Sequence, residues 1–198
     1  MLEEKYDQAL KIKTSGIREW RNDKNGYNRY EATPYEALEK LFENYTIEAD
    51  DKLVDFGAGR GRVSFYVHNR FNIPVSGVEN NDKTFDEALQ NEQTYLKGRR
   101  KDDASLYFEF GLAENYEIQA DDNLFFFFNP FSVKIFKKVI HNITKSIKLN
   151  DRQADVILYY PLTEFEHAMK QTPFRLMNKI DVPGIHGKYG KFYVYRFG

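Results

Sequence analysis

The chain has 198 residues, a formal net charge of −1 and a composition that is 41% hydrophobic and 16% aromatic. This length fits one domain with a core of its own and leaves little room for a separate substrate domain. The absence of cysteine excludes a disulfide framework and a thiolate metal site. The near-neutral charge gives the whole chain no bias towards nucleic acid or membranes, and the charged N-terminus and short apolar runs predict a cytoplasmic protein without a membrane partner.

Residues 1–32 are predicted to form an N-terminal arm or lid, ahead of a single domain over residues 33–198. Within 11–29 the arm carries six basic side chains against two acidic ones, with Trp20 and Tyr27 interleaved. Basic and aromatic side chains together could bind single-stranded nucleic acid through phosphate pairing and base stacking. The alternative is a solvated cover whose aromatic residues pack on the domain.

A helix is predicted to follow the arm. Thr33 is placed as its N-cap, Pro34 at its first turn and Glu36 as the partner that closes a capping box. The apolar residues of this helix recur at helical spacing and are Leu38, Leu41, Phe42 and Tyr45.

The most informative stretch is 52–62. An apolar run ends at an acidic residue, Asp55, and breaks into three glycines at alternate positions before an amphipathic helix begins. Glycine allows a positive φ angle and a close approach of a ligand to the backbone. A second apolar run ends at Glu79, whose carboxylate could accept hydrogen bonds from two ribose hydroxyls. These features predict a nucleoside site at the carboxyl edge of a parallel sheet.

The glycine spacing separates two classes of nucleoside. A dinucleotide fingerprint needs its third glycine three positions after the second, where this chain has Arg62. The series Asp55, Gly57, Gly59 and Gly61 instead resembles the Asp-x-Gly-x-Gly-x-Gly motif of the class I S-adenosylmethionine-dependent methyltransferases. An acidic residue beside the turn suits a cationic sulfonium and would repel a pyrophosphate.

The resemblance implies S-adenosylmethionine as the cofactor. It places the methionine part of the cofactor on Asp55 and the glycine turn, the ribose on Glu79, and a covering segment on Tyr30 and Thr33, although Thr33 could equally serve only as a helix cap. The cofactor-binding residues that it implies are Tyr30, Thr33, Asp55, Phe56, Gly57, Gly59, Gly61, Glu79, Asn80, Ala113, Glu114 and Asn129.

A further helix is predicted from an apolar stripe at Phe85, Ala88, Leu89 and Leu96, and a third strand over 105–110 follows it. In the resembled family the turn after this strand usually presents an acid followed by alanine to the adenine. Here Leu112 stands in the place of the acid, so the backbone near Ala113 or the side chain of Glu114 is expected to hold the adenine.

The fourth strand, 123–130, is a continuous apolar run and is expected to be buried on both faces. It ends in Asn129-Pro130-Phe131, which matches half of the Asn/Asp-Pro-Pro-Tyr/Phe pattern of enzymes that methylate planar amino groups. The resemblance therefore implies that Asn129, Pro130 and Phe131 face the methyl acceptor as catalytic residues. The alternative is a turn that enters a helix, with Ser132 as the cap.

The rest of the chain completes the predicted fold. A helix through Ile147, a strand over 154–160, a short helix and two final strands follow. The fold class expected is α/β, a Rossmann-like three-layer sandwich with a seven-stranded, mostly parallel sheet and an antiparallel C-terminal hairpin strand. The four histidines lie in separate predicted elements, so no metal site is expected.

The function that these features predict is S-adenosylmethionine-dependent methyl transfer to an unidentified acceptor, which could be a nitrogen of RNA, of protein or of a small molecule. A nicotinamide-dependent reductase is the rival enzyme class, and Arg62 disfavours it. A non-catalytic module that binds S-adenosylmethionine or RNA is the third alternative. The sequence does not indicate an oligomeric state.

Overall fold

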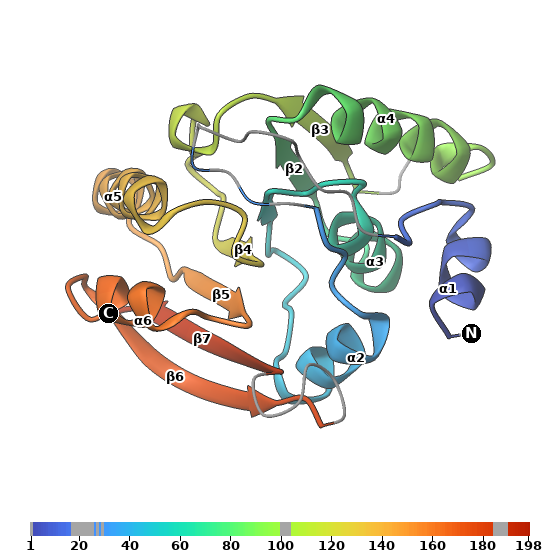
Figure 1. Cartoon of the computed structure of the whole chain (residues 1–198). Helices are drawn as coiled ribbons and strands as arrows, with labels where there is room; N and C mark the ends of the chain where they lie inside the picture. The colour runs from blue at the N-terminus through green and yellow to red at the C-terminus, as the bar shows by residue number, and fades with distance from the viewer. Residues whose placement is uncertain (1, 17–25, 27, 29, 100–103, 184–189) are drawn as a thin grey trace.

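The structure is a computed structural model and describes residues 2–16, 26, 28, 30–99, 104–183 and 190–198 (Figure 1). Seven strands are described: Leu53–Phe56 (β1), Val75–Glu79 (β2), Leu106–Phe110 (β3), Leu124–Phe127 (β4), Asp155–Tyr159 (β5), Phe174–Asp181 (β6) and Lys191–Phe197 (β7). The helices are Leu2–Leu10 (α1), Tyr35–Asn44 (α2), Arg62–Phe71 (α3), Asp82–Leu96 (α4), the 3-10 turn Ala113–Asn115 (η1), Val133–Leu149 (α5) and Thr163–Met169 (α6).

The strands form one sheet in the order β3-β2-β1-β4-β5-β7-β6. Strands β1 to β5 are parallel, and β7 pairs antiparallel with both β5 and β6. The chain moves from β1 outward to β3 and then returns to the other side of β1 with β4, so the topological switch point lies between β1 and β4. Ligands of open α/β sheets bind beyond the carboxyl ends of the strands at this point.

The sheet lies between two layers of helices (Figure 1). One core cluster packs residues of α1 to α4 against one face of the sheet, and a second packs α5 and α6 against the other face. Strands β1 and β4 are buried at every position, as expected for strands that are covered on both faces. The predicted fold class is therefore confirmed.

Two predictions about local structure are wrong. Thr33 does not cap α2, because Pro34 occupies the N-cap position and no side chain caps it there; the amide of Tyr35 donates instead to Glu3 Oε1 of α1, at 3.1 Å. Leu96 is not on the buried face of α4, since 40% of it is exposed while Tyr95 is buried. The buried stripe of α4 passes through Asn91, a polar residue that the apolar periodicity does not count.

Candidate functional site

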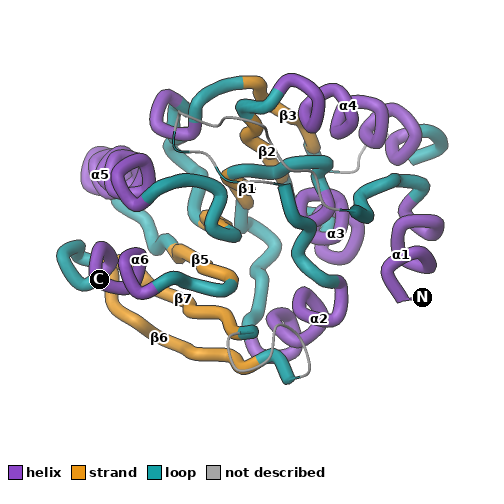
Figure 2. Tube along the Cα trace, in the orientation of Figure 1, coloured by secondary structure: helices purple, strands orange, loops and turns teal. Residues whose placement is uncertain are grey.

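The glycine turn between β1 and α3 lies at the switch point. Gly57 has φ of 77° and Gly59 has φ of 57°, which L side chains rarely adopt. A Cβ at Gly57 would lie 2.3 Å from Cβ of Pro130, and a Cβ at Gly59 would lie 2.3 Å from the ring of Tyr30. The turn therefore needs glycine for conformation and for space, and it brings the loop after β4 and Tyr30 to the same place. These loops are drawn in teal in Figure 2.

Glu79, at the end of β2, is buried next to this turn. Its Oε2 accepts a hydrogen bond from the amide of Gly59 at 2.7 Å, and its Oε1 accepts from the amides of Asn80 and Asn81 at 2.9 and 2.8 Å. Burial raises the pKa of Glu79, and the backbone hydrogen bonds oppose that rise. A carboxylate has about four acceptor positions, and the side chain of Thr84 interacts with Glu79 in addition to the three amides, so a ligand hydroxyl would have to replace one of these partners.

Asp55 lies within β1, beneath the turn. Its Oδ2 accepts a hydrogen bond from Oγ of Ser64 at 2.8 Å, and only 3% of the residue is exposed. Burial raises the pKa of Asp55 to about 7, and the nearby charge of Glu79 adds to the rise while Ser64 opposes it. Contact of Asp55 with a cofactor stays a prediction; its carboxyl group holds the start of α3 in this structure.

Tyr30 and Thr33 form a wall beside the glycine turn. The hydroxyl of Tyr30 donates to the carbonyl of Thr14 at 2.6 Å, and the guanidinium of Arg60 lies 5.0 Å from the ring centroid. Thr33 is buried, and its carbonyl accepts a hydrogen bond from Nη1 of Arg62 at 3.3 Å. Burial raises the pKa of Tyr30, so this hydroxyl acts as a hydrogen-bond donor and not as an anion.

The loop after β4 carries an unusual backbone. Asn129 has φ of 40°, and Tyr160, which follows β5, has φ of 51°. Nδ2 of Asn129 donates to the carbonyl of Tyr160 at 2.6 Å, which joins the two positions. A left-handed backbone conformation is rare at a bulky residue such as tyrosine, and backbone strain of this kind is common at ligand-binding sites.

Two carbonyls of the same loop are already bonded. The amide of Asn28 donates to the Pro130 carbonyl at 2.9 Å, and Nδ2 of Asn28 donates to the Asn129 carbonyl at 2.7 Å. Phe131 is fully buried and packs edge-on against Phe127, so its side chain supports the loop from within the core, and its contact with an acceptor stays a prediction.

Some of the remaining predicted residues lie beside the glycine turn, and others point away from it. The amide of Gly111 donates to the carbonyl of Glu79 at 3.0 Å, which places the turn containing Ala113 beside the ribose-binding candidate. Glu114 faces α5, because its carboxylate pairs with Nζ of Lys138 at 3.5 Å. The ring of Phe56 is buried and stacks on Phe127. The structure thus gathers Gly57, Gly59, Glu79, Asn80, Ala113, Tyr30, Asn129 and Pro130. It leaves the side chains of Phe56 and Phe131 in the core, and Gly61 lies against the core rings of Phe65 and Phe108.

Sequence reasoning missed three contributors to this region. Asn28 lies in the stretch 11–29, which is interpreted through its basic and aromatic residues. Arg62 enters only as a departure from a glycine pattern, and Tyr160 enters only as the last residue of the strand predicted over 154–160. Their partners are far away in sequence, so the sequence carried no local signal for their contacts.

No protein-family model matches this chain. A protein-lysine N-methyltransferase of Saccharolobus islandicus (strain REY15A) is 32% identical over 87 residues, which are 43% of this chain and 54% of that protein. The match spans about half the length of this curated relative.

Solved structures share the fold. An RNA methyltransferase from Salinibacter ruber, in complex with S-adenosyl-L-homocysteine, has a TM-score of 0.61 at 15% identity and covers 84% of this chain and 93% of its own. A geranyl diphosphate C-methyltransferase from Streptomyces coelicolor A3(2) has a TM-score of 0.59 at 13% identity and covers 83% and 76%. The chain therefore has the Rossmann-like fold of the S-adenosylmethionine-dependent methyltransferases.

Among the described helices, none is both long enough and apolar enough to cross a bilayer. The described residues contain no group of three or more histidine, cysteine or acidic side chains placed to hold a metal ion.

Proposed function

We propose that this protein is an S-adenosylmethionine-dependent methyltransferase. The observation that carries the proposal is the position of Glu79, a buried carboxylate bonded to the Gly59 amide at the topological switch point. Two acids near the turn, Asp55 and Glu79, favour a cationic ligand over a pyrophosphate. The protein-lysine N-methyltransferase that is 32% identical to this chain over 87 residues supports the same activity.

The chain's own residues would bind and orient the reactants. Glu79 would hold the ribose, the backbone of the Ala113 turn the adenine, and the glycine turn with Tyr30 the methionine part. When bound, S-adenosylmethionine supplies an activated methyl group on its sulfonium. Catalysis then consists mainly of aligning the acceptor and excluding water.

Asn129 is the residue that we place against the acceptor. Its Nδ2 is held by the Tyr160 carbonyl, which leaves Oδ1 without a hydrogen bond from the described residues. Oδ1 can therefore accept an N–H of an acceptor amine. The Pro130 carbonyl accepts from the amide of Asn28 and has a second lone pair that an amine could use. The acceptor atom is accordingly proposed to be a nitrogen.

Isothermal titration calorimetry with S-adenosylmethionine tests the proposal. Wild type should bind, and Glu79→Ala should weaken binding by about tenfold to a hundredfold, as expected for loss of hydrogen bonds to a charged group. Gly59→Val should abolish binding, because the new side chain collides with Tyr30.

The matched controls are Glu109→Ala, which changes an exposed glutamate of β3, and Gly198→Val, where a Cβ meets nothing within 4 Å. Both should bind like wild type. Failure of wild type to bind, or equal losses in the site and control variants, would contradict the proposal.

Two other functions are tested in parallel. A nicotinamide-dependent reductase is disfavoured because Arg62 at the third fingerprint position is buried and ion-paired with Glu3; titration with NADH should show no binding. A non-catalytic module would bind S-adenosylmethionine but transfer no label to RNA, protein or metabolite pools. The cytoplasmic location remains a prediction.

A further inference from the structure

Helix α5 carries all of its charge in one sign. Its 17 residues, VKIFKKVIHNITKSIKL, include five lysines and no aspartate or glutamate. At about 100° per residue the lysines and His141 fall within a sector of about 100° of the helix surface. The residues of this basic stripe are Lys134, Lys137, Lys138, His141, Lys145 and Lys148, and all are exposed.

The stripe lies on the solvent-facing side of α5. The opposite face of α5 is buried in the core through Ile135, Phe136, Val139, Ile140, Ile143 and Ile147. Only Lys138 has an ion-pair partner, Glu114, among the described residues. By contrast α1, α2, α4 and α6 each carry more acidic than basic residues.

Helix stability explains only the C-terminal end of the stripe, where Lys148 in the last turn interacts favourably with the helix dipole. Lysines three or four residues apart repel one another by about 0.2–0.5 kcal/mol a pair, and positive charge in the first turn, at Lys134, opposes the helix dipole. A helix selected only for solubility would mix both signs. Positions where a sequence breaks local rules tend to be functional.

The stripe begins at the candidate site. Helix α5 starts directly after the loop of Asn129 and Pro130, and Pro130 lies against Gly57. Glu114, the partner of Lys138, belongs to the turn beside Glu79. From there the stripe runs away from the carboxyl edge for about 21 Å, at about 1.5 Å per residue.

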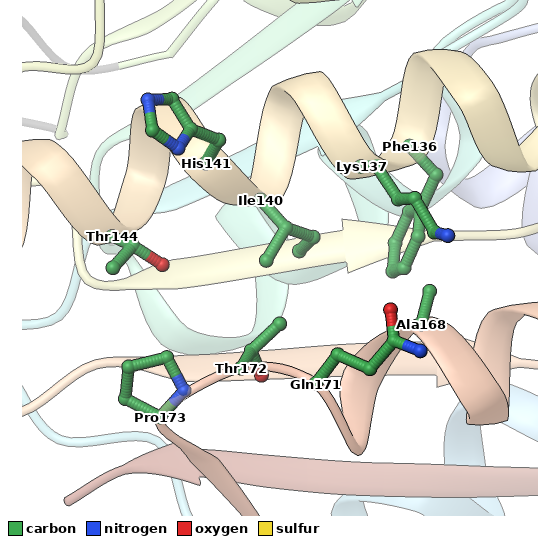
Figure 3. A pocket seen from close by; sticks show the side chains of 9 residues that line it. All are labelled: Phe136, Lys137, Ile140, His141, Thr144, Ala168, Gln171, Thr172 and Pro173. Atoms are coloured by element: carbon green, nitrogen blue, oxygen red, sulfur yellow. The ribbon is translucent and has the colours of Figure 1, made fainter.

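A cleft of about 260 Å³ lies along one side of the stripe. Lys137, His141 and Thr144 of α5 line one side of it and Gln171 and Thr172 line the other; in Figure 3 Lys137 and Thr144 point towards that other side, while the ring of His141 points away from it. Lysine, threonine and glutamine side chains are typical contacts of nucleic-acid phosphates and sugars.

We propose that the basic stripe of α5 is a docking surface for the phosphodiester backbone of a nucleic acid, and that the methyl acceptor is a base of that nucleic acid. The inference rests on the proposed methyltransferase activity and names its substrate class. A lipid surface fits less well, because a helix that lies on a membrane inserts its apolar face, and that face of α5 is buried in the core.

The test uses fluorescence anisotropy of short fluorescein-labelled RNA and DNA oligonucleotides of one sequence, over a range of salt concentrations. The test variant is Lys134→Gln/Lys137→Gln/Lys145→Gln, which leaves the Lys138–Glu114 pair intact. The control variant is Lys5→Gln/Lys83→Gln/Lys97→Gln, three exposed lysines in the opposite layer. Circular dichroism and the titration with S-adenosylmethionine should be unchanged in both.

Loss of three phosphate contacts should lower the slope of log affinity against log salt by about 2 for a single strand, and weaken binding about a hundredfold at about 0.1 M salt. The control variant should bind like wild type. The proposal would be overturned if the test variant bound as tightly as wild type, or if the control variant lost as much affinity as the test variant. Binding of poly-glutamate as tight as that of the oligonucleotides would also overturn it.

Transfer of labelled methyl groups separates the substrate class from the activity. Label in RNA or in DNA supports the proposal and identifies which of the two is used, while label in protein alone overturns it. If wild type binds no S-adenosylmethionine but the oligonucleotide results are as expected, the methyltransferase activity fails and the docking surface stands. If S-adenosylmethionine binds and no oligonucleotide does, the activity stands and this inference fails.

Discussion

Asp55 shows how one buried residue sets a pH dependence. Among the described residues its carboxyl group has one side-chain hydrogen-bond partner, Ser64, and it lies beside the charge of Glu79. Burial raises its pKa from 3.8 to about 7, so the folded state holds this proton more tightly than the unfolded chain does. The stability that follows is fully present below about pH 4 and is lost as the pH rises through about 7.

Asp55→Asn should remove this dependence. The asparagine keeps an oxygen that can accept from Ser64 and carries no charge, so the variant should gain stability over wild type as the pH rises, by up to about 4 kcal/mol at pH 8. Urea unfolding at pH 5 and pH 8 measures the difference. A constant difference between the two proteins across this range would contradict the raised pKa.

At the scale of elements, Arg62 joins the N-terminal helix to the glycine turn. It is the first residue of α3 and is 4% exposed. Its guanidinium pairs with Glu3, donates through Nε to Oγ1 of Thr14 at 2.7 Å and lies 4.4 Å from the ring centroid of Tyr35. Thr14 in turn holds the hydroxyl of Tyr30, so α1 positions the wall of the site through this network.

Arg62→Met should destabilise the fold by about 3–5 kcal/mol, because it leaves buried or half-buried carboxylates of α1 without their cation. Arg70→Met is the matched control: Arg70 lies on the same helix, is exposed and bonds to the Tyr66 hydroxyl, so its loss should cost less than about 1 kcal/mol. Urea unfolding of both variants measures these values. Similar losses in the two would mean that the α1 network does not hold the fold.

Elements with strong local patterns could be predicted from the sequence. The runs of β1, β2 and β4 and the stripe of α5 contain their own evidence, since buried strands are continuous and amphipathic helices are periodic. The cap of α2 could not be predicted from the sequence, because Glu3, which accepts from the amide of Tyr35, lies 32 residues away. The exposure of Leu96 could not be predicted either, because the buried face of α4 includes Asn91, which bonds to Lys13 of the distant N-terminal segment.

In the candidate site, too, residues that are close in sequence could be predicted and contacts between distant residues could not. The glycines and Glu79 form a motif whose members are close in sequence, and the structure places them together. Asn28 bonds to Asn129 across 101 residues, and Tyr160 bonds to Asn129 across 31. Only the topology of the sheet, which aligns the ends of β1, β4 and β5, brings such partners together. The basic segment within 17–25 lies outside the described residues, so its predicted role in nucleic-acid binding stays a prediction.

At the scale of the whole molecule, the site is assembled from both core layers. The glycine turn, Glu79 and Tyr30 belong to the part of the fold that α1 to α4 cover, while Asn129 and Pro130 lead into α5. No one element contains the site, so a ligand bound there contacts segments that separate on unfolding. Binding should therefore stabilise the complete domain and not one part of it.

The stabilisation can be calculated from the affinity. At a free concentration of about 100 times Kd, a ligand that binds only the folded state adds about 2.7 kcal/mol, which for a domain of this size raises Tm by about 5 to 10 °C. S-adenosylmethionine should produce this shift in wild type as a single transition, while NADH should produce none. Glu79→Ala should show a much smaller shift at the same concentration, because its Kd is higher. A Tm shift of equal size in Glu79→Ala and wild type would mean that the ligand binds elsewhere. Two separate transitions would mean that the two layers unfold independently and that the ligand stabilises only one of them.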